Sequence, residues 1–272
     1  MATLESVRRE RLERLEPGDI DVLIAMPGRF DEPALLAAYD ALMTDAERAR
    51  QRAFVFERHR IESLVTRALV RTALSRYRPV APEAWRFEKN EHGCPRIEPP
   101  CGLSFNLSNH PTMVVCAVTE GAAIGVDVEP LSRAPEIVEV AGDVFTPTEQ
   151  AELATLGPEG KRDRAVTLWT LKEAYIKARG LGLALPLDGF AFRFDDPTRP
   201  RISFAASIDD DPARWWFHTV DVAEHRIALA LERAPTPTML DAEVRVRVRV
   251  CVPLREEADG ESVIHNALAP LT

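Results

Sequence analysis

The clearest hydrophobic period in the chain lies between residues 57 and 77. Apolar side chains recur there every three or four positions, which predicts a helix with one face in a core. The helical tract is expected to begin at Thr44, because Thr44 and Glu47 form a capping-box pattern in which each side chain can bond the other's backbone N–H. The arginines of this tract are expected to form its solvated side. They are Arg48, Arg50, Arg52, Arg58 and Arg60.

A second helix is predicted over residues 169–182. No proline interrupts this segment, and Gly180 stands where a helix needs a left-handed closing residue. Another capping box, at residues 146–149, has proline at the first helical position and predicts a shorter helix that ends near Leu156.

Runs of apolar or alternating residues bounded by turn residues predict several strands. They cover residues 21–26, 85–95, 113–118, 124–129, 190–194, 201–206, 215–222 and 226–231. The turn at residues 119–122 predicts that 113–118 and 124–129 pair as a hairpin.

The predicted strand 124–129 carries two carboxylates on one face. Its apolar side chains face one way, while Gly125, Asp127 and Glu129 face the other, because side chains alternate along a strand. Asp127 and Glu129 then lie about 7 Å apart. On a solvated sheet face such a pair has no special meaning, whereas a divalent cation would offset the repulsion between the two charges. Both interpretations stay open on the strand alone.

The predicted helix 169–182 combines acidic and basic side chains within one turn. Lys172 is adjacent to Glu173, and Lys177 follows Glu173 by four positions. Taken alone, this is either an ordinary Glu–Lys surface pair or an acid and a base held ready for chemistry.

Residues 244–250 alternate strictly between valine and arginine, after an exit from the packed body that Pro235 and Pro237 mark. The alternation predicts a strand with three arginines on one face. Such charges protect an edge strand against aggregation, and the alternative is a docking surface for an acidic partner.

Composition narrows the class of protein. The 272 residues include 34 basic and 43 acidic side chains, a net charge of −9, which argues against a nucleic-acid binder. No apolar run is long enough to span a bilayer and residues 1–14 do not resemble a signal peptide, so we expect a cytoplasmic protein. The four cysteines and six histidines show no Cys-x-x-Cys or His-Glu-x-x-His spacing, so neither a disulfide scaffold nor a zinc site is expected.

The order of two motifs is specific. Gly-x-Asp-x-Glu at residues 125–129 is followed by Trp-x-x-Lys-Glu-x-x-x-Lys-x-x-Gly-x-Gly at residues 169–182. This combination resembles the 4′-phosphopantetheinyl transferases, in particular the monomeric surfactin-synthetase-activating type. The resemblance covers residues 44–232 and includes Phe-Asn-Leu-Ser at 105–108, Gly-x-Pro at 93–95 and Phe-Val-Phe at 54–56.

The resemblance implies an α+β fold of two similar halves related by a pseudo-twofold axis, with the active site in the cleft between them. The halves would be residues 1–122 and 123–234, and residues 235–272 would form an extension with an extra strand. Members of the family transfer the phosphopantetheine arm of coenzyme A to a serine of an apo acyl or peptidyl carrier protein and release 3′,5′-ADP. A monomer without a nucleic-acid or membrane partner is implied.

The resemblance also implies the roles of the motif residues. Asp127, Glu129 and Glu173 match the family's ligands of Mg²⁺, an ion that prefers oxygen donors. Glu173 or a metal-bound water would take the proton of the carrier serine, and Glu149 is a further candidate for this base. Lys177 would stabilise or protonate the departing phosphate, and Lys172 would pair with the pyrophosphate of coenzyme A.

Coenzyme A is expected to contact residues upstream of these motifs. Arg50 and Lys89 occupy positions that are basic in the family, where they would bind the adenosine 3′-phosphate, and Ser108, Asn109 and His110 would line the same substrate. Two positions depart from the family pattern. Cys94 stands where lysine is usual, so one phosphate contact is either missing or supplied by Arg96. Asn109 stands where histidine is usual, and His110 would replace it if the loop before Pro111 bends differently.

Carrier proteins in this family present an acidic helix, so a local basic or apolar patch is expected despite the negative net charge, with the tail arginines as candidates. The carrier would serve fatty-acid, polyketide or nonribosomal-peptide synthesis, and the residues leave these three open. One alternative is a non-catalytic module that binds coenzyme A or a carrier. Another is a metal-dependent phosphohydrolase, which would cleave coenzyme A without a carrier.

Overall fold

The structure, a computed structural model, describes residues 12–196, 199–233 and 244–255. This part of the chain divides into two compact units, each with a sheet and one long helix packed on it; the sheet of unit 1 is mixed and that of unit 2 is antiparallel. Unit 1 contains residues 12–88, 95–121 and 244–255, and unit 2 contains residues 89–94, 122–196 and 199–233. The α+β class expected from the sequence is confirmed.

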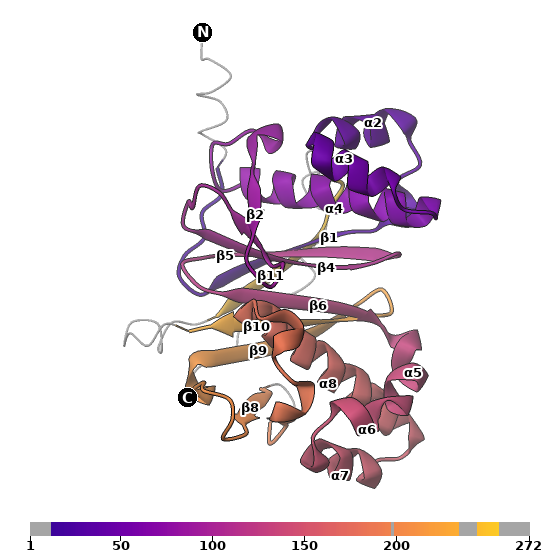
Figure 1. The fold of residues 1–272 in the computed structure, drawn as a ribbon, viewed down its shortest axis with the longest axis vertical. Coiled ribbons are helices and arrows are strands. Elements are labelled where there is room, and N and C mark those ends of the chain that lie inside the picture. The colour runs from indigo at the N-terminus through magenta and orange to yellow at the C-terminus, as the bar shows by residue number, and fades with distance from the viewer. Residues whose placement is uncertain (1–11, 197–198, 234–243, 256–272) are drawn as a thin grey trace. The chain divides into compact units, whose positions relative to one another are not determined.

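Unit 1 is built on a four-stranded sheet in the order β11-β1-β5-β4 (Figure 1). Its strands are β1 (Asp19–Ala25), β4 (Leu103–His110), β5 (Met113–Glu120) and β11 (Arg245–Val250). Helix α4 (Glu57–Ser75) packs on this sheet and buries the apolar face that its period predicted. The unit also contains η1 (Pro27–Arg29), α2 (Pro33–Ala41), α3 (Asp45–Arg52), η2 (Pro82–Ala84), β2 (Phe87–Lys89) and β3 (Pro95–Ile97).

The helical tract that was expected to run unbroken from Thr44 is two helices. The capping box is confirmed, since the Thr44 hydroxyl accepts from the Glu47 N–H and the Glu47 carboxylate accepts from the Thr44 N–H. Helix α3 ends at Arg52, and Phe56 is extended before α4 begins. Two aromatic residues and a valine occupy the junction, and such residues favour helix less than the flanking arginines do.

Unit 2 is built on a three-stranded antiparallel sheet in the order β6-β10-β9 (Figure 1). Its strands are β6 (Ile124–Pro130), β9 (Trp215–Val222) and β10 (His225–Glu232). Helix α8 (Pro158–Arg179) packs across β6 and β10 and ends at Gly180, whose φ of 62° confirms the left-handed cap. The remaining elements are η3 (Leu131–Arg133), α5 (Ala134–Glu139), α6 (Ala141–Val144), α7 (Pro147–Thr155), η4 (Gly182–Ala184), η5 (Leu187–Gly189), β7 (Phe190–Arg193), β8 (Arg201–Phe204) and η6 (Pro212–Arg214).

The predicted hairpin of β5 and β6 is wrong. Both edges of β5 are occupied, by β1 and by β4, so it has no free edge for β6. Strand β6 pairs with β10 instead, with Asp127 opposite Ala228 and Glu129 opposite Arg226.

Two segments lie outside the halves expected for them. The turn at residues 89–94 belongs to unit 2, where the Asn90 side chain donates a hydrogen bond to the Gly180 carbonyl at 2.8 Å. The strand predicted in the tail is β11, which pairs in parallel with β1 and so belongs to unit 1. Pro235 and Pro237 lie outside the described residues.

The arginines of β11 are held by ion pairs within unit 1. Arg249 contacts Glu13 at 2.5 Å and the buried Asp21 at 3.1 Å, and Arg245 contacts Asp19 at 2.8 Å. The Tyr77 hydroxyl donates to the same Asp21 carboxylate. Binding an acidic partner would have to break these pairs, so the structure favours the edge-strand interpretation over a docking surface.

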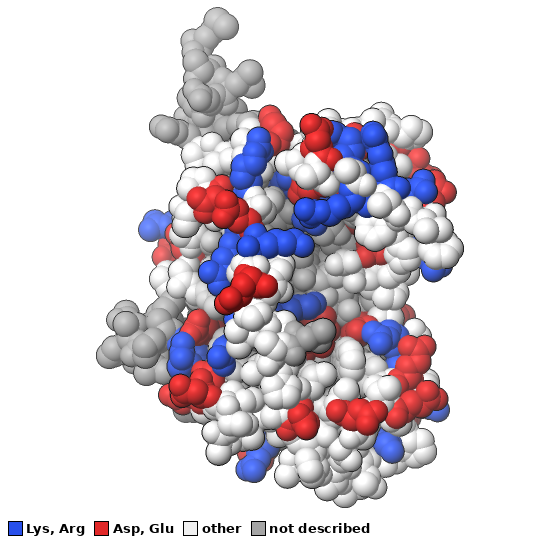
Figure 2. Space-filling view, in the orientation of Figure 1, with Lys and Arg blue, Asp and Glu red and all other residues white. Residues whose placement is uncertain are grey.

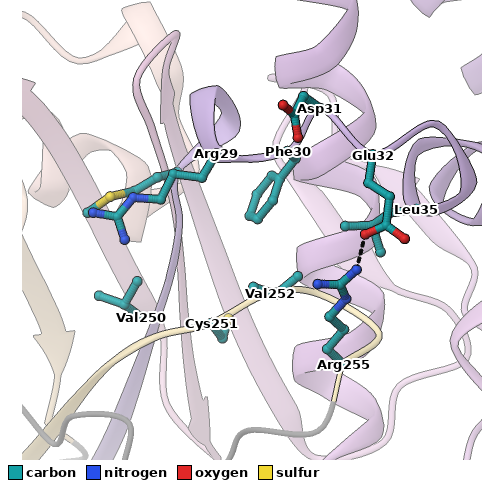
Figure 3. Close-up of a pocket in the computed structure, with 10 residues that line it drawn as sticks. Arg29, Phe30, Asp31, Glu32, Leu35, Val250, Cys251, Val252 and Arg255 are labelled. Atoms are coloured by element: carbon teal, nitrogen blue, oxygen red, sulfur yellow. Dashed lines mark hydrogen bonds and ion pairs between the residues drawn. The ribbon is translucent and has the colours of Figure 1, made fainter.

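The segment after β11 closes a cavity of about 230 Å³ against η1 and the start of α2 (Figure 3). An ion pair between Arg255 and Glu32 joins its two sides, and the Tyr39 hydroxyl donates to the Pro253 carbonyl at 3.1 Å. None of the predicted site residues lines this cavity. The segment therefore completes the packing of unit 1.

In the described chain, each helix is too short or too polar to cross a membrane.

Candidate functional site

The site is built where α8 lies directly on β6. A Cβ atom added at Gly125 would lie 1.9 Å from the Ala174 carbonyl oxygen and 2.5 Å from the Ala178 backbone nitrogen. Only glycine permits this approach. Because side chains alternate along the strand, Asp127 and Glu129 also face the helix rather than solvent, and both are buried.

Three motif residues spaced by four positions form one face of α8 toward these carboxylates. The Lys177 ammonium lies 2.7 Å from Asp127 Oδ1, and Trp169 Nε1 donates to Glu129 Oε1 at 3.0 Å. Glu173 stands midway between Trp169 and Lys177 on the helix. The structure therefore brings together the strand motif and the helix motif. Trp169 thus takes part in the site by holding a carboxylate.

Arg133 is a site residue that the sequence analysis missed. Its guanidinium lies 2.5 Å from Glu129 Oε1 and stands over the Trp169 ring, 5.7 Å from the centroid. It belongs to the short helix η3 after β6, outside both motifs. Arg133 follows Glu129 by four positions, but this spacing does not predict a contact here. Residues four apart face each other only within a helix, and Glu129 belongs to a strand, β6.

The charge of Asp127 raises the pKa of both glutamates of the site. Burial raises the pKa of Glu173, and the charges of Asp127 and Glu129 add to this while Lys177 opposes it. Burial and the charge of Asp127 likewise raise the pKa of Glu129, against the hydrogen bonds from Arg133 and Trp169. The Glu173 carboxylate makes no hydrogen bond or ion pair with the described residues, so its oxygens are available to a substrate or an ion.

The carboxylates of Asp127, Glu129 and Glu173 offer the oxygen donors and the negative charge that a hard divalent cation prefers. Burial and nearby negative charge disfavour the ionised forms of Glu129 and Glu173, which such an ion would stabilise. Over residues 12–196, 199–233 and 244–255, however, no three His, Cys, Asp or Glu side chains converge closely enough to hold a metal. Lys177 and Arg133 occupy the positions next to Asp127 and Glu129, so binding would require the carboxylates to exchange these cations for the ion.

The structure corrects the roles expected for Lys172 and Glu149. Lys172 is fully buried, with its ammonium 2.9 Å from Glu149 Oε2 and donating to the carbonyls of Leu187 and Phe190. Glu149 completes the capping box of α7 and accepts from the Phe192 N–H at 2.9 Å. Successive helix positions differ by about 100° in direction, so Lys172 faces the core while Glu173 faces β6. Neither Lys172 nor Glu149 can meet a substrate there.

The residues upstream of the two motifs that were expected to contact coenzyme A belong partly to unit 1 and partly to unit 2. In unit 1, Arg50 is exposed in α3, Ser108 is buried in β4, and the Asn109 amide donates to the Glu62 carboxylate. The strand remains regular through His110, which pairs with Met113, so His110 and Asn109 face opposite sides. The expectation that a bend lets His110 replace Asn109 is therefore wrong.

The other two positions lie in the turn of unit 2. Lys89 is exposed at the end of β2, and Cys94 is half-buried with its N–H bonded to the Asn90 side chain at 2.8 Å. Asn90 also bonds the Gly180 carbonyl, so this turn is fixed against the end of α8.

Comparison with known proteins identifies the family. Residues 123–230 match the model of the 4′-phosphopantetheinyl transferase superfamily. A 4′-phosphopantetheinyl transferase of Bacillus subtilis is 32% identical over 166 residues, which cover 61% of this chain and 71% of the relative. The transferase Sfp of Bacillus subtilis is 31% identical over 153 residues, 56% of this chain and 67% of Sfp.

Among solved structures, a holo-(acyl-carrier-protein) synthase from Bacillus anthracis in complex with coenzyme A aligns with 41% of this chain and 96% of its own, at 20% identity and a TM-score of 0.34. The family itself is established by the sequence relatives. The chain belongs to the 4′-phosphopantetheinyl transferase superfamily and is an enzyme of the Sfp-like type.

Proposed function

We propose that this enzyme transfers the 4′-phosphopantetheine group of coenzyme A to a serine of an apo acyl or peptidyl carrier protein, with release of 3′,5′-ADP, in a Mg²⁺-dependent reaction. The observation that carries the proposal is the pairing of the two motifs. The Lys177 ammonium meets Asp127, the Trp169 indole meets Glu129, and Glu173 lies between these contacts on α8.

Asp127, Glu129 and Glu173 would hold the ion. When bound, Mg²⁺ supplies positive charge that polarises the pyrophosphate of coenzyme A. The protein's own contribution is to bury Asp127 and Glu129 beside the half-buried Glu173 at one helix–strand contact, where the negative charge of Asp127 next to the two glutamates makes a cation favourable.

Glu173 is the proposed general base. Its carboxylate accepts the proton of the carrier serine hydroxyl as the serine oxygen bonds to the pantetheine-side phosphorus, and the bond from that phosphorus to the 3′,5′-ADP oxygen breaks. A carboxylate with a raised pKa is a stronger proton acceptor than an ordinary one. The Lys177 ammonium then stabilises or protonates the leaving phosphate oxygen.

Arg50 and Lys89 are the proposed cations for the adenosine 3′-phosphate, and Ser108 is proposed to contact the same substrate. Asn109 is engaged by Glu62, so its contribution would require that hydrogen bond to break. We also propose that the enzyme is a cytoplasmic monomer.

Lys172 is excluded from this set, and Lys172→Met tests the exclusion. We expect the substitution to lower the free energy of unfolding by about 3 kcal/mol, because Glu149 would lose its buried partner. The KM for coenzyme A of the folded enzyme should not change. Urea denaturation and steady-state kinetics measure both, with Lys161→Met on the same helix as the control. A raised KM for coenzyme A with unchanged stability would show that Lys172 contacts the substrate after all.

Intact-mass spectrometry of an apo carrier protein, incubated with the enzyme, coenzyme A and Mg²⁺, tests the proposed function. We expect a gain of one phosphopantetheine per carrier and none when EDTA removes the metal. Binding of coenzyme A without transfer to any carrier class would indicate the non-catalytic module. Cleavage of coenzyme A in the absence of a carrier would indicate the phosphohydrolase.

A further inference from the structure

Three consecutive large apolar side chains are exposed at the junction of α3 and α4. Phe54 is 44% exposed, Val55 82% and Phe56 58%. In the described part of the chain, the other exposed large hydrophobic residues are single ones, Val140 and Leu254. An exposed cluster of this kind costs hydration free energy and marks an interaction site. We call Phe54, Val55 and Phe56 the apolar tip.

The apolar tip is held in its conformation by its own neighbours. Arg60 Nε donates to the Phe54 carbonyl at 2.8 Å, and Gln51 donates to the Arg60 carbonyl at 3.3 Å. The His59 ring lies 6.2 Å from the Phe54 ring and 6.0 Å from the Phe56 ring, centroid to centroid. A surface fixed in this way loses little conformational entropy when a partner binds.

Arginines surround the apolar tip. The Arg58 guanidinium stands over the Phe56 ring, 5.0 Å from its centroid, and Arg50 and Arg52 lie in the last turn of α3. None of these three forms an ion pair with a carboxylate of the described residues, in contrast to the arginines of β11. Figure 2 shows Lys and Arg side chains gathered over α3 and α4. The surface is therefore locally basic on a chain of net charge −9.

We propose that the apolar tip, together with Arg52 and Arg58, docks the protein substrate, the apo carrier, through an acidic surface with apolar residues at its centre. This inference rests on the proposed function. Aromatic residues and arginine dominate the binding energy of protein interfaces. The sign of the local charge selects an acidic partner and repels a basic one. An exposed valine and two phenylalanines suit the apolar centre of a protein surface.

Two substitutions in the apolar tip test this. Val55→Asp and Phe56→Ser should each raise the KM for the carrier at least about tenfold, the cost expected for an interface hot spot. The KM for coenzyme A and kcat at saturating carrier should stay within about twofold. The side chains are exposed, so the melting temperature should not fall. Val140→Ser and Leu254→Ser are matched controls, because each replaces a single exposed apolar residue elsewhere, and neither should change the carrier KM.

Ionic strength gives a second readout. Added salt should raise the carrier KM of the native enzyme, and this dependence should weaken in Arg58→Ala, because screening acts on the charges that attract the acidic partner.

An unchanged carrier KM in both tip variants would overturn the docking site. If the tip variants raise only the KM for coenzyme A, the docking site is also overturned, and the coenzyme binds at the tip. If the native enzyme sediments as a dimer and the tip variants do not, a second copy of the chain binds there instead of the carrier. Fluorescence anisotropy of a labelled apo carrier measures docking without turnover. If the native enzyme binds the carrier through the tip but transfers nothing, the proposed function fails and the docking site stands.

Discussion

Replacing Glu173 with glutamine is expected to reduce kcat for carrier modification about 10³-fold, the effect typical of losing a positioned general base. Glutamine has nearly the same volume but cannot take the serine proton. The fold should tolerate the change, because the Glu173 carboxylate makes no hydrogen bond or ion pair in the described structure. The loss should therefore appear in activity and not in folding.

Stability should move in the opposite direction. Burial and the charge of Asp127 raise the pKa of Glu173, so its ionised form is destabilised in the folded protein at neutral pH. A neutral glutamine removes that cost, and the melting temperature should stay equal or rise. A site that trades stability for function gives this combination of effects, whereas a structural residue would lose both.

Steady-state kinetics with a carrier substrate and thermal unfolding on the same preparation provide the measurement. Glu159→Gln, in the exposed first turn of α8, is the control and should leave kcat unchanged. If Glu173→Gln retains more than half of the native kcat, the base is another group, and the metal-bound water becomes the leading candidate.

Local patterns in the sequence predicted much of what the structure contains. The capping boxes at Thr44 and Thr146, the end of α8 at Gly180 and the alternation of β11 each depend on residues a few positions apart. The strand motif and the helix motif could be assigned to a strand and a helix for the same reason, because each motif spans only neighbouring residues. What brings these two motifs together is the bare backbone of Gly125.

The errors involved information that the local sequence does not hold. The partner of β6 was wrong because it depends on whether β5 still has a free edge, and β1, almost a hundred residues earlier, occupies it. Lys172 was assigned to the substrate because it neighbours Glu173 in the motif, although one helix position turns it into the core beside Glu149. The ion pairs of the tail arginines with Glu13 and Asp21 likewise join opposite ends of the chain.

The tail arginines were the candidates for a docking surface in the sequence, whereas the proposed surface is the apolar tip. An alternating run of arginines is conspicuous in a sequence, while the arginines around residues 54–56 look like an ordinary solvated helix face. Exposure and pairing distinguish the two groups, and both are properties of the folded chain. The β11 arginines are paired with carboxylates, and Arg50, Arg52 and Arg58 form no ion pair with a carboxylate of the residues that the structure describes.

Replacing Gly125 with alanine is expected to lower the free energy of unfolding by about 4 kcal/mol or more, at the upper end of single substitutions. The new methyl group would lie 1.9 Å from the Ala174 carbonyl oxygen and 2.5 Å from the Ala178 nitrogen, and these backbone atoms cannot move aside as a side chain can. The alternative to unfolding is separation of α8 from β6. Such a separation would lengthen the contact of Lys177 with Asp127 and of Trp169 with Glu129, so any folded fraction should have lost transfer activity.

Urea denaturation followed by circular dichroism measures this effect, with Gly142→Ala as the control. A methyl group at Gly142, in helix α6, would meet no atom within 4 Å, and alanine favours helix over glycine by about 1 kcal/mol, so this variant should be as stable as the native enzyme or more so. A Gly125→Ala variant within about 1 kcal/mol of the native stability would contradict the close packing of α8 on β6. Such a result would also leave the contacts of Asp127 with Lys177 and of Glu129 with Trp169 unexplained, because the close approach of α8 to β6 is what brings these side chains together.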